Sequence, residues 1–221
     1  MSKSDKDDGY VSLAESAYRA LEERIATLQL APGTVVSEFK LAEELRIGRS
    51  PIREALQRLA HEGLVVILPR RGILVSQINV STHCKLIEVR REVERLMVRA
   101  ACRNATAAQL AGFQNLAADF DRVVRDDDMD LFMRTDAEFN KLLTVSADNE
   151  FAERSMQLMR GLIRRFWFKY FGPPGLKKCA RLHARLARAI AKPDVREATD
   201  ALDRLVDYIE EFTRSTLDPR A

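Results

Sequence analysis

The sequence predicts a mainly α-helical protein in two parts, a small module of helices with a β-hairpin and then an all-α bundle. Apolar residues recur at helical spacing along most of the 221 residues, which include only 9 Gly and 7 Pro. A β-branched run with a Pro/Gly turn interrupts this pattern once, near residue 70. With 46% hydrophobic and 31% charged residues, the composition excludes a low-complexity or collagen-like chain.

Composition also bounds the compartment and the partners. Three widely spaced cysteines, Cys84, Cys102 and Cys179, favour a reducing cytoplasm over a disulfide framework or a zinc ribbon. No apolar stretch approaches the roughly 20 residues that span a bilayer, and the charged start lacks the apolar core of a signal peptide. We therefore expect a soluble cytoplasmic protein with no membrane partner.

The N-terminal part reads as three helices behind a disordered tail at residues 1–9. A helical pattern runs from Leu13 to Leu28 before Pro32-Gly33 stops it, and a second opens at Ser37-Glu38 and breaks at Gly48. Ser50-Pro51 is a helix-start signal, in which Ser can cap free backbone amides and Pro suits the first turn. This third helix ends near Gly63.

A two-stranded hairpin follows the third helix. Residues 64–68 are rich in β-branched side chains and form the first strand. Pro69 to Gly72 form the turn, and residues 73–75 form the second strand. Helix, turn, helix and hairpin is the order of a winged helix-turn-helix, which we place at residues 10–76. A polar linker at 77–81 ends it.

Residues 82–216 form the expected all-α domain, and 217–221 a tail. Six segments show the 3.6-residue period between Asn, Asp, Gly or Pro breakers. They are 82–104, 107–126, 129–146, 149–171, 176–192 and 194–216.

Positive charge gathers on the third helix, its entry and the hairpin tip. Six arginines stand against two acids there, namely Arg46, Arg49, Arg53, Arg58, Arg70 and Arg71 against Glu54 and Glu62. A winged helix presents these elements to DNA, and Arg49 and Arg53, four residues apart, can reach phosphates or a guanine edge. The alternative is a solvated helix face.

A second asymmetry lies in the bundle, where residues 154–192 hold eleven Lys or Arg and no acid. Arg160 and Arg164 lie one turn apart and precede an aromatic run, so they could hold a carboxylate or phosphate ligand with an apolar part. The alternative is pairing with the acidic segments 119–130 and 194–211.

The N-terminal motifs resemble the winged-helix domain of GntR-type transcriptional regulators. The residues that carry the resemblance are Pro32-Gly33, Ser37-Glu38, Leu41-Ala42, Arg49 to Leu56, Leu59, Glu62 to Val65 and Arg71-Gly72. The resemblance implies a double-stranded DNA operator, and together with the charge pattern it predicts these contact residues: Arg46, Arg49, Ser50, Arg53, Arg70, Arg71 and Gly72.

This module also departs from the family pattern. Phe39 stands where the family often has a DNA-contacting Arg, Lys40 where an acid is common, and Arg46 where the turn usually has Gly. We therefore expect rearranged phosphate contacts.

The bundle resembles the FCD effector domain of the FadR-like branch. The matching residues are Glu88 to Arg90, Val93-Glu94, Asp136, Phe139, His183, Ile190, Asp194 and Ala198. The resemblance implies a homodimer whose bundle binds a small carboxylate, often through a metal held by one Asp and three His.

The metal ligands carry over only in part. Asp136 and His183 match, Asn140 stands at a His position, and Leu205 replaces the last His, so a divalent metal such as zinc has a reduced ligand set. In the second interpretation, the same residues form a metal-free polar pocket in which Arg90 receives an acid group. In the third, they are a buried hydrogen-bonded trio.

We expect a ligand-responsive repressor of metabolic genes that binds an inverted-repeat operator as a homodimer, with a small anionic metabolite as effector. A metal-dependent enzyme using Asp136 and His183 is the second hypothesis. It lacks a nucleophile and base constellation, a Gly-rich phosphate loop and an HExxH motif. A regulator whose bundle only dimerises is the third.

Overall fold

The computed structural model describes residues 12–216, except the side chains of Pro173 and Pro174. The tails expected at 1–9 and 217–221 lie outside this range. Contacts divide the chain into two units, of which the first holds residues up to Ile78 together with Gly161–Lys169. The second holds Asn79–Arg160 and the residues from Tyr170 onward.

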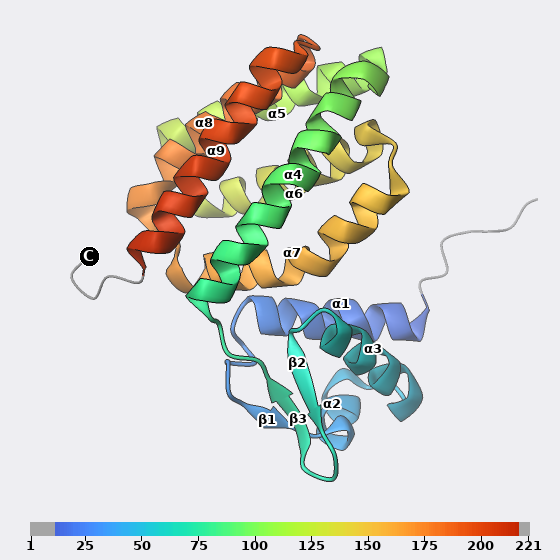
Figure 1. Ribbon diagram of the computed structural model, residues 1–221. Helices are drawn as coiled ribbons and strands as arrows, with labels where there is room; N and C mark the ends of the chain where they lie inside the picture. The colour runs from blue at the N-terminus through green and yellow to red at the C-terminus, as the bar shows by residue number, and fades with distance from the viewer. Residues whose placement is uncertain (1–11, 217–221) are drawn as a thin grey trace, which may run out of the picture. The chain divides into compact units, whose positions relative to one another are not determined.

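The first unit contains three helices and a small sheet, shown at the blue and teal end of the chain in Figure 1. Ser12 and Ser37 cap two of the helices, because each side chain accepts a hydrogen bond from a backbone amide three residues on. The elements are α1 (Leu13–Ala26), β1 (Val35–Val36), α2 (Glu38–Leu45), α3 (Arg49–His61), β2 (Val65–Leu68) and β3 (Gly72–Val75).

Helix α3 begins at Arg49, one residue before the predicted start. Its N-cap is Gly48, which offers no side chain to the free amides, so Ser50 stands in the first turn and does not cap the helix. The apolar stripe of α3 consists of Ile52, Ala55, Leu56 and Leu59, which are all buried. They pack in one core with Leu21 and Ile25 of α1 and Ile73 and Val75 of β3.

The sheet has three antiparallel strands in the order β1-β3-β2, one more than the sequence predicts. The additional strand, β1, pairs Val35 with Leu74 of β3. Gly72 makes this approach possible: it has φ +106°, and a Cβ there would lie 2.7 Å from the carbonyl oxygen of Val36.

The second unit consists, in its described residues, of helices joined by short loops. Asn79, Thr106, Asp128 and Asp194 cap four of its helices through side-chain oxygens. The helices are α4 (Val80–Asn104), α5 (Ala107–Asp126), α6 (Met129–Ala147), α7 (Glu150–Tyr170), α8 (Pro173–Ala191) and α9 (Val195–Ser215). Residues Gly161–Lys169, in the C-terminal half of α7, belong to the first unit. The mainly α fold class is confirmed.

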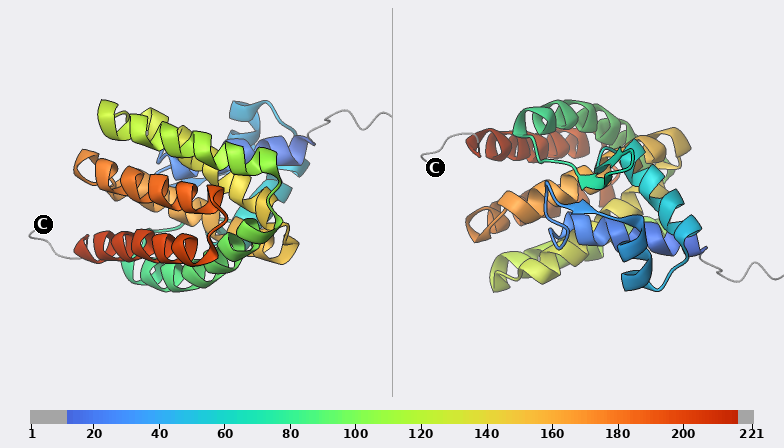
Figure 2. Two further views of the ribbon diagram at one scale, coloured as in Figure 1. Left: turned by 90° about the horizontal axis from the view of Figure 1, so that it is seen from above. Right: turned by 90° about the horizontal axis from the view of Figure 1, so that it is seen from below.

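Helix α8 lies between α5 and α9, and α9 packs in turn against α4 (Figure 2). Small side chains make close packing possible along α8, where Ala180, Ala184, Ala187 and Ala189 are buried. Aromatic rings of α5 and α6 fill the adjacent core, with the Phe113 and Phe139 ring centroids 5.7 Å apart. The side chains described below therefore stand on closely packed helices.

Candidate DNA-binding surface and effector pocket

The exposed face of α3 carries three of the predicted DNA contacts. Its buried stripe fixes the helix against the core, so Arg49, Ser50 and Arg53 lie on the opposite, exposed face. An arginine face of this kind can place guanidinium groups against phosphates or a guanine edge.

Two residues of α2 hold the arginines of α3. The guanidinium carbon of Arg49 lies 5.0 Å from the ring centroid of Phe39, a cation–π contact. Arg53 donates to Glu38 from Nη2 at 2.9 Å and from Nε at 3.2 Å. The two guanidinium groups are therefore positioned before any DNA is bound.

Arg46 and Arg70 occupy left-handed backbone conformations, with φ 54° and 62°. Arg46 ends α2, and Arg70 lies in a turn closed by a hydrogen bond from the Arg71 amide to the Leu68 carbonyl oxygen. Glycine relieves such strain, so an arginine at these turns is retained against a conformational cost of roughly 1 kcal/mol.

Four predicted contact arginines keep their charge available to a polyanion. Arg46, Arg49, Arg70 and Arg71 are exposed, and within residues 12–216 none of them forms an ion pair with a protein carboxylate. Gly72, the last predicted contact, serves the geometry of the sheet as described above.

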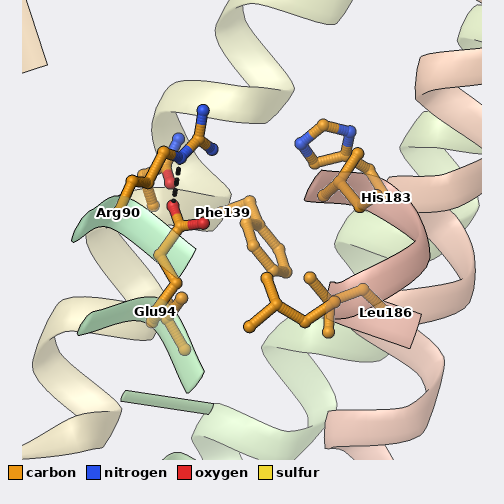
Figure 3. A pocket seen from close by; sticks show the side chains of 9 residues that line it. Arg90, Glu94, Phe139, His183 and Leu186 are labelled. Carbon is orange, nitrogen blue, oxygen red and sulfur yellow. Dashed lines mark hydrogen bonds and ion pairs between the residues drawn. The ribbon is translucent and has the colours of Figure 1, made fainter. Parts of the chain in front are cut away.

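A small buried pocket lies between four helices of the second unit (Figure 3). Arg90 and Glu94 of α4 lie on one side, His183 and Leu186 of α8 on the other, and Phe139 of α6 between them. Asn140, Leu143, Leu202 and Leu205 complete the lining. The pocket thus combines charged groups with apolar walls, as small-molecule sites do.

His183 is held by acceptors at both ring nitrogens. Its Nδ1 lies 2.9 Å from the carbonyl oxygen of Cys179, and its Nε2 lies 3.1 Å from Oδ1 of Asp136. A carbonyl and a carboxylate can only accept, so these two contacts favour the protonated imidazole, in which both nitrogens donate. Burial lowers the pKa of His183, but Cys179 and Asp136 outweigh it and raise the pKa to about 10.

Aromatic rings enclose His183 on several sides. Phe120 stacks on it with centroids 5.0 Å apart, while Phe132 and Phe139 present edges at 5.7 and 6.0 Å. The rings fix the plane of the imidazole and exclude water from it.

The structure brings Asp136, Asn140 and His183 together. Oδ1 of Asp136 accepts from Nε2 of His183, and Oδ2 accepts from the side-chain amide of Asn140 at 3.0 Å. Asn140 also donates to the backbone carbonyl of Asp136 at 2.8 Å. One carboxylate therefore bridges an amide and an imidazolium.

Arg90 is buried and forms an ion pair with Glu94, one helical turn on, with Nε 2.8 Å from Oε1. Burial lowers the pKa of Arg90, but the negative charges of Glu94 and Asp136 outweigh this effect and raise the pKa overall. The guanidinium therefore stays charged. The second carboxylate oxygen of Glu94 is buried and has no hydrogen-bond partner among the described residues. Glu94 is not among the predicted site residues, although its spacing of four residues from Arg90 is a sequence signal for such an ion pair.

These residues do not fit a resident transition metal. Asn140 turns its amide nitrogen, a donor, toward Asp136, and Leu205 lines the pocket with methyl groups. In the described part of the chain, no three His, Cys, Asp or Glu side chains are grouped so that they could hold a metal ion. The Asp136 carboxylate and the His183 imidazole are already bonded to each other.

Arg160 and Arg164 are not among the lining residues of this pocket. Arg164 donates to Glu22 and Glu23 within the first unit, both at 2.5 Å, so its guanidinium is occupied by carboxylates and not open to an anionic ligand. Arg160 is exposed. Other cations of the basic stretch pair with the acidic segments, as Arg188 does with Asp121.

No helix in the described range is long and apolar enough to cross a membrane.

A three-helix unit with a β-hairpin, followed by a helical unit with a charged pocket, is the architecture of a one-component transcriptional regulator. Residues 13–75 match the bacterial regulatory proteins of the gntR family, and residues 85–208 match the FCD domain. The chain belongs to the GntR family of transcriptional regulators and carries an FCD domain; it is a regulator and not an enzyme.

Known relatives cover nearly the whole chain. The HTH-type transcriptional repressor RspR of Escherichia coli K12 is 27% identical over 205 residues, which are 91% of this chain and 87% of that protein. The solved structure of E. coli McbR/YncC has a TM-score of 0.79 at 19% identity and covers 95% of this chain and 100% of its own. A GntR regulator from Rhodococcus sp. RHA1 has a TM-score of 0.68 at 21% identity, covering 93% and 99%. These two structures share the fold.

Proposed function

We propose that this regulator is a cytoplasmic homodimeric repressor that binds an inverted-repeat operator and releases it in response to a small carboxylate or related anionic metabolite. The RspR relative, described as a repressor, supports the direction of control. The observation that carries the ligand class is the buried guanidinium of Arg90 in a pocket that also has apolar walls.

The pocket chemistry favours a short organic acid. A carboxylate can take a bidentate pair of hydrogen bonds from a guanidinium, and here it would compete with Glu94 for Arg90. Phe139, Leu143 and Leu202 surround the remaining space with hydrocarbon, so the rest of the ligand should be small and apolar. His183 adds a second positive charge. Because the donor set does not fit a metal, recognition would rest on these side chains alone.

DNA recognition would rest on α3 and the hairpin. Arg49, Ser50 and Arg53 would enter the major groove, while Arg70 and Arg71 would reach the phosphate backbone or the minor groove. Each phosphate contact releases counterions, so affinity should fall steeply with salt.

The DNA-binding proposal is tested by selecting genomic fragments with the purified protein and footprinting them at several salt concentrations with nonspecific competitor. A short protected inverted repeat is expected. Loss of all selectivity under competition would contradict operator binding.

The effector proposal is tested by thermal unfolding and operator release with a panel of two- to six-carbon mono- and dicarboxylates. Because removing Arg90 alone would leave Glu94 as an unpaired buried charge, the informative variant is the double change Arg90→Met with Glu94→Met. It should bind operator like wild type and respond to no acid. The control Arg91→Met alters a neighbouring α4 arginine that pairs with Asp207 outside the pocket. If no acid acts on wild type, the proposed ligand class is wrong.

A further inference from the structure

We propose that α2 sets the sequence discrimination of this protein: Phe39 and Glu38 restrain the reading arginines Arg49 and Arg53, and Phe39 itself contacts a thymine methyl group. This inference rests on the proposed DNA binding and adds two specificity-determining residues to it. Neither residue is among the predicted contacts.

Phe39 is an exposed phenyl ring on a helix of otherwise polar surface. It is 52% exposed, although burying such a ring would stabilise the fold by roughly 2 kcal/mol. One face of the ring carries the guanidinium of Arg49, at 5.0 Å from the centroid. Stacking limits the orientations of that guanidinium, whose N–H edge remains free for a bidentate contact with guanine.

The exposed remainder of the Phe39 ring provides an apolar surface beside Arg49. Among the groups that the major groove presents, the C5 methyl of thymine is the apolar one, and phenylalanine is a residue that contacts it. The expected half-site therefore has a thymine adjacent to the guanine that Arg49 reads. An arginine or lysine in place of Phe39 would instead add a phosphate contact.

Glu38 acts on Arg53 by charge. It lies in the first turn of α2 and accepts two hydrogen bonds from Arg53, from Nη2 and Nε, so part of the guanidinium is already occupied. The carboxylate also places a negative charge next to the arginines that would meet the phosphates. Repulsion of any DNA, combined with a restrained Arg53, weakens nonspecific binding more than specific binding.

The experiment is selection from a randomised half-site library, followed by titration of the selected and a scrambled duplex. The variants are Phe39→Ala, Phe39→Leu and Glu38→Gln, compared with wild type. Glu43→Gln is the matched control, because Glu43 is an exposed acid of the same helix and forms no ion pair in the described structure. Thermal unfolding accompanies each variant.

Phe39→Ala should lower the preference for guanine at the Arg49 position by about 2- to 5-fold, the strength of an exposed cation–π contact, and should remove the thymine preference. Phe39→Leu should keep the thymine preference and lower the guanine preference to the same extent as Phe39→Ala, since it retains the apolar contact without the aromatic face. Glu38→Gln should raise affinity for the scrambled duplex on the order of 2- to 5-fold and reduce the specific-to-nonspecific ratio accordingly.

Unchanged base preferences in both Phe39 variants, or an unchanged ratio in Glu38→Gln, would overturn the inference, as would the same shifts in Glu43→Gln. A wild-type protein that selects no sequence would instead refute the proposed DNA binding. A purely structural role for either residue would lower thermal stability while leaving base preferences intact.

Discussion

At the scale of single residues, the arginines differ in whether the folded chain provides a carboxylate that pairs with the guanidinium. Arg164 is held by two glutamates through both of its terminal nitrogens, whereas Arg90 is paired with the single glutamate Glu94 through Nε. Arg46 and Arg70 are exposed in left-handed turns. Because these two arginines occupy strained turns and remain exposed, we expect their charge to meet a partner outside the chain.

Arg53→Ala is expected to weaken operator binding by about 1–3 kcal/mol without unfolding the protein, because Arg53 is exposed and makes no core contact. Electrophoretic or fluorescence titration of the footprinted operator measures the change, with circular dichroism to check the fold. Wild-type affinity in this variant would remove Arg53 from the recognition role.

Arg70→Gly separates stability from binding. Glycine accepts the φ of 62° without strain, so the free energy of unfolding should stay equal or rise by up to about 1 kcal/mol, while operator affinity falls. The comparison variant Arg71→Gly lies next to it, outside the left-handed positions, and should gain no stability. Urea unfolding and DNA titration of both variants decide the matter; equal operator affinity in Arg70→Gly would exclude a DNA contact there.

At the scale of elements, helix α3 is fixed to α1 by a polar cluster. The Tyr18 hydroxyl donates to Glu62 at 2.9 Å, and Arg58 of α3 lies 3.5 Å from the Tyr18 ring centroid while bonding Glu15 and Glu62. Burial and the negative charge of Glu62 raise the pKa of Tyr18, so the hydroxyl keeps its proton. The cluster orients α3 from the side opposite to the proposed DNA.

Tyr18→Phe should therefore destabilise the first unit by about 1–2 kcal/mol, because it removes hydrogen bonds to a buried carboxylate and keeps the ring. Chemical denaturation measures this cost. Arg19→Ala, which breaks an exposed pair with Glu15, is the control and should change stability by less than about 0.5 kcal/mol. Equal effects of the two changes would show that the cluster does not hold α3.

At the scale of the whole molecule, the proposed function assigns DNA recognition to the first unit and small-ligand recognition to the second. The predicted DNA contacts lie on an exposed face around α3, whereas the charged pocket is buried among helices of the second unit. Binding two half-sites of an inverted repeat requires two copies of the chain.

The native mass should therefore be about twice the 25.1 kDa of one chain. Sedimentation velocity at micromolar concentration measures it, and a footprint that covers two half-sites should accompany it. A single-chain mass on the operator would contradict the dimer.

Stability of the whole molecule should also depend on pH through His183. Its pKa is raised from 6.5 to about 10, so the protonated ring stabilises the fold fully below pH 6.5, and this contribution is lost as pH rises toward 10. The difference in unfolding free energy between wild type and His183→Gln should shrink over that range. Denaturant titrations at pH 6, 8 and 9.5 measure it, and a constant difference would contradict the raised pKa.

Local patterns predicted most of the elements and part of the pocket. Helix positions followed from apolar spacing, caps and breakers, which act within a few residues. β1 was missed because Val35–Val36 is too short to show alternation and exists only through pairing with β3. The grouping of Asp136, Asn140 and His183 was expected from a family resemblance, whereas the presence of Glu94 in the pocket was not. The role of all four residues in ligand binding stays a prediction.

By itself, the sequence determined the fold class, the family and the arginine-rich third helix, because these are encoded in contiguous motifs and periodicities. The tertiary structure decided which charges find a partner. Arg164 meets Glu22, which is 142 residues away in sequence, and Arg53 meets Glu38 across two helices, while Arg90 faces His183 in a pocket. Such pairings depend on long-range packing, which brings distant residues together and which no local spacing encodes.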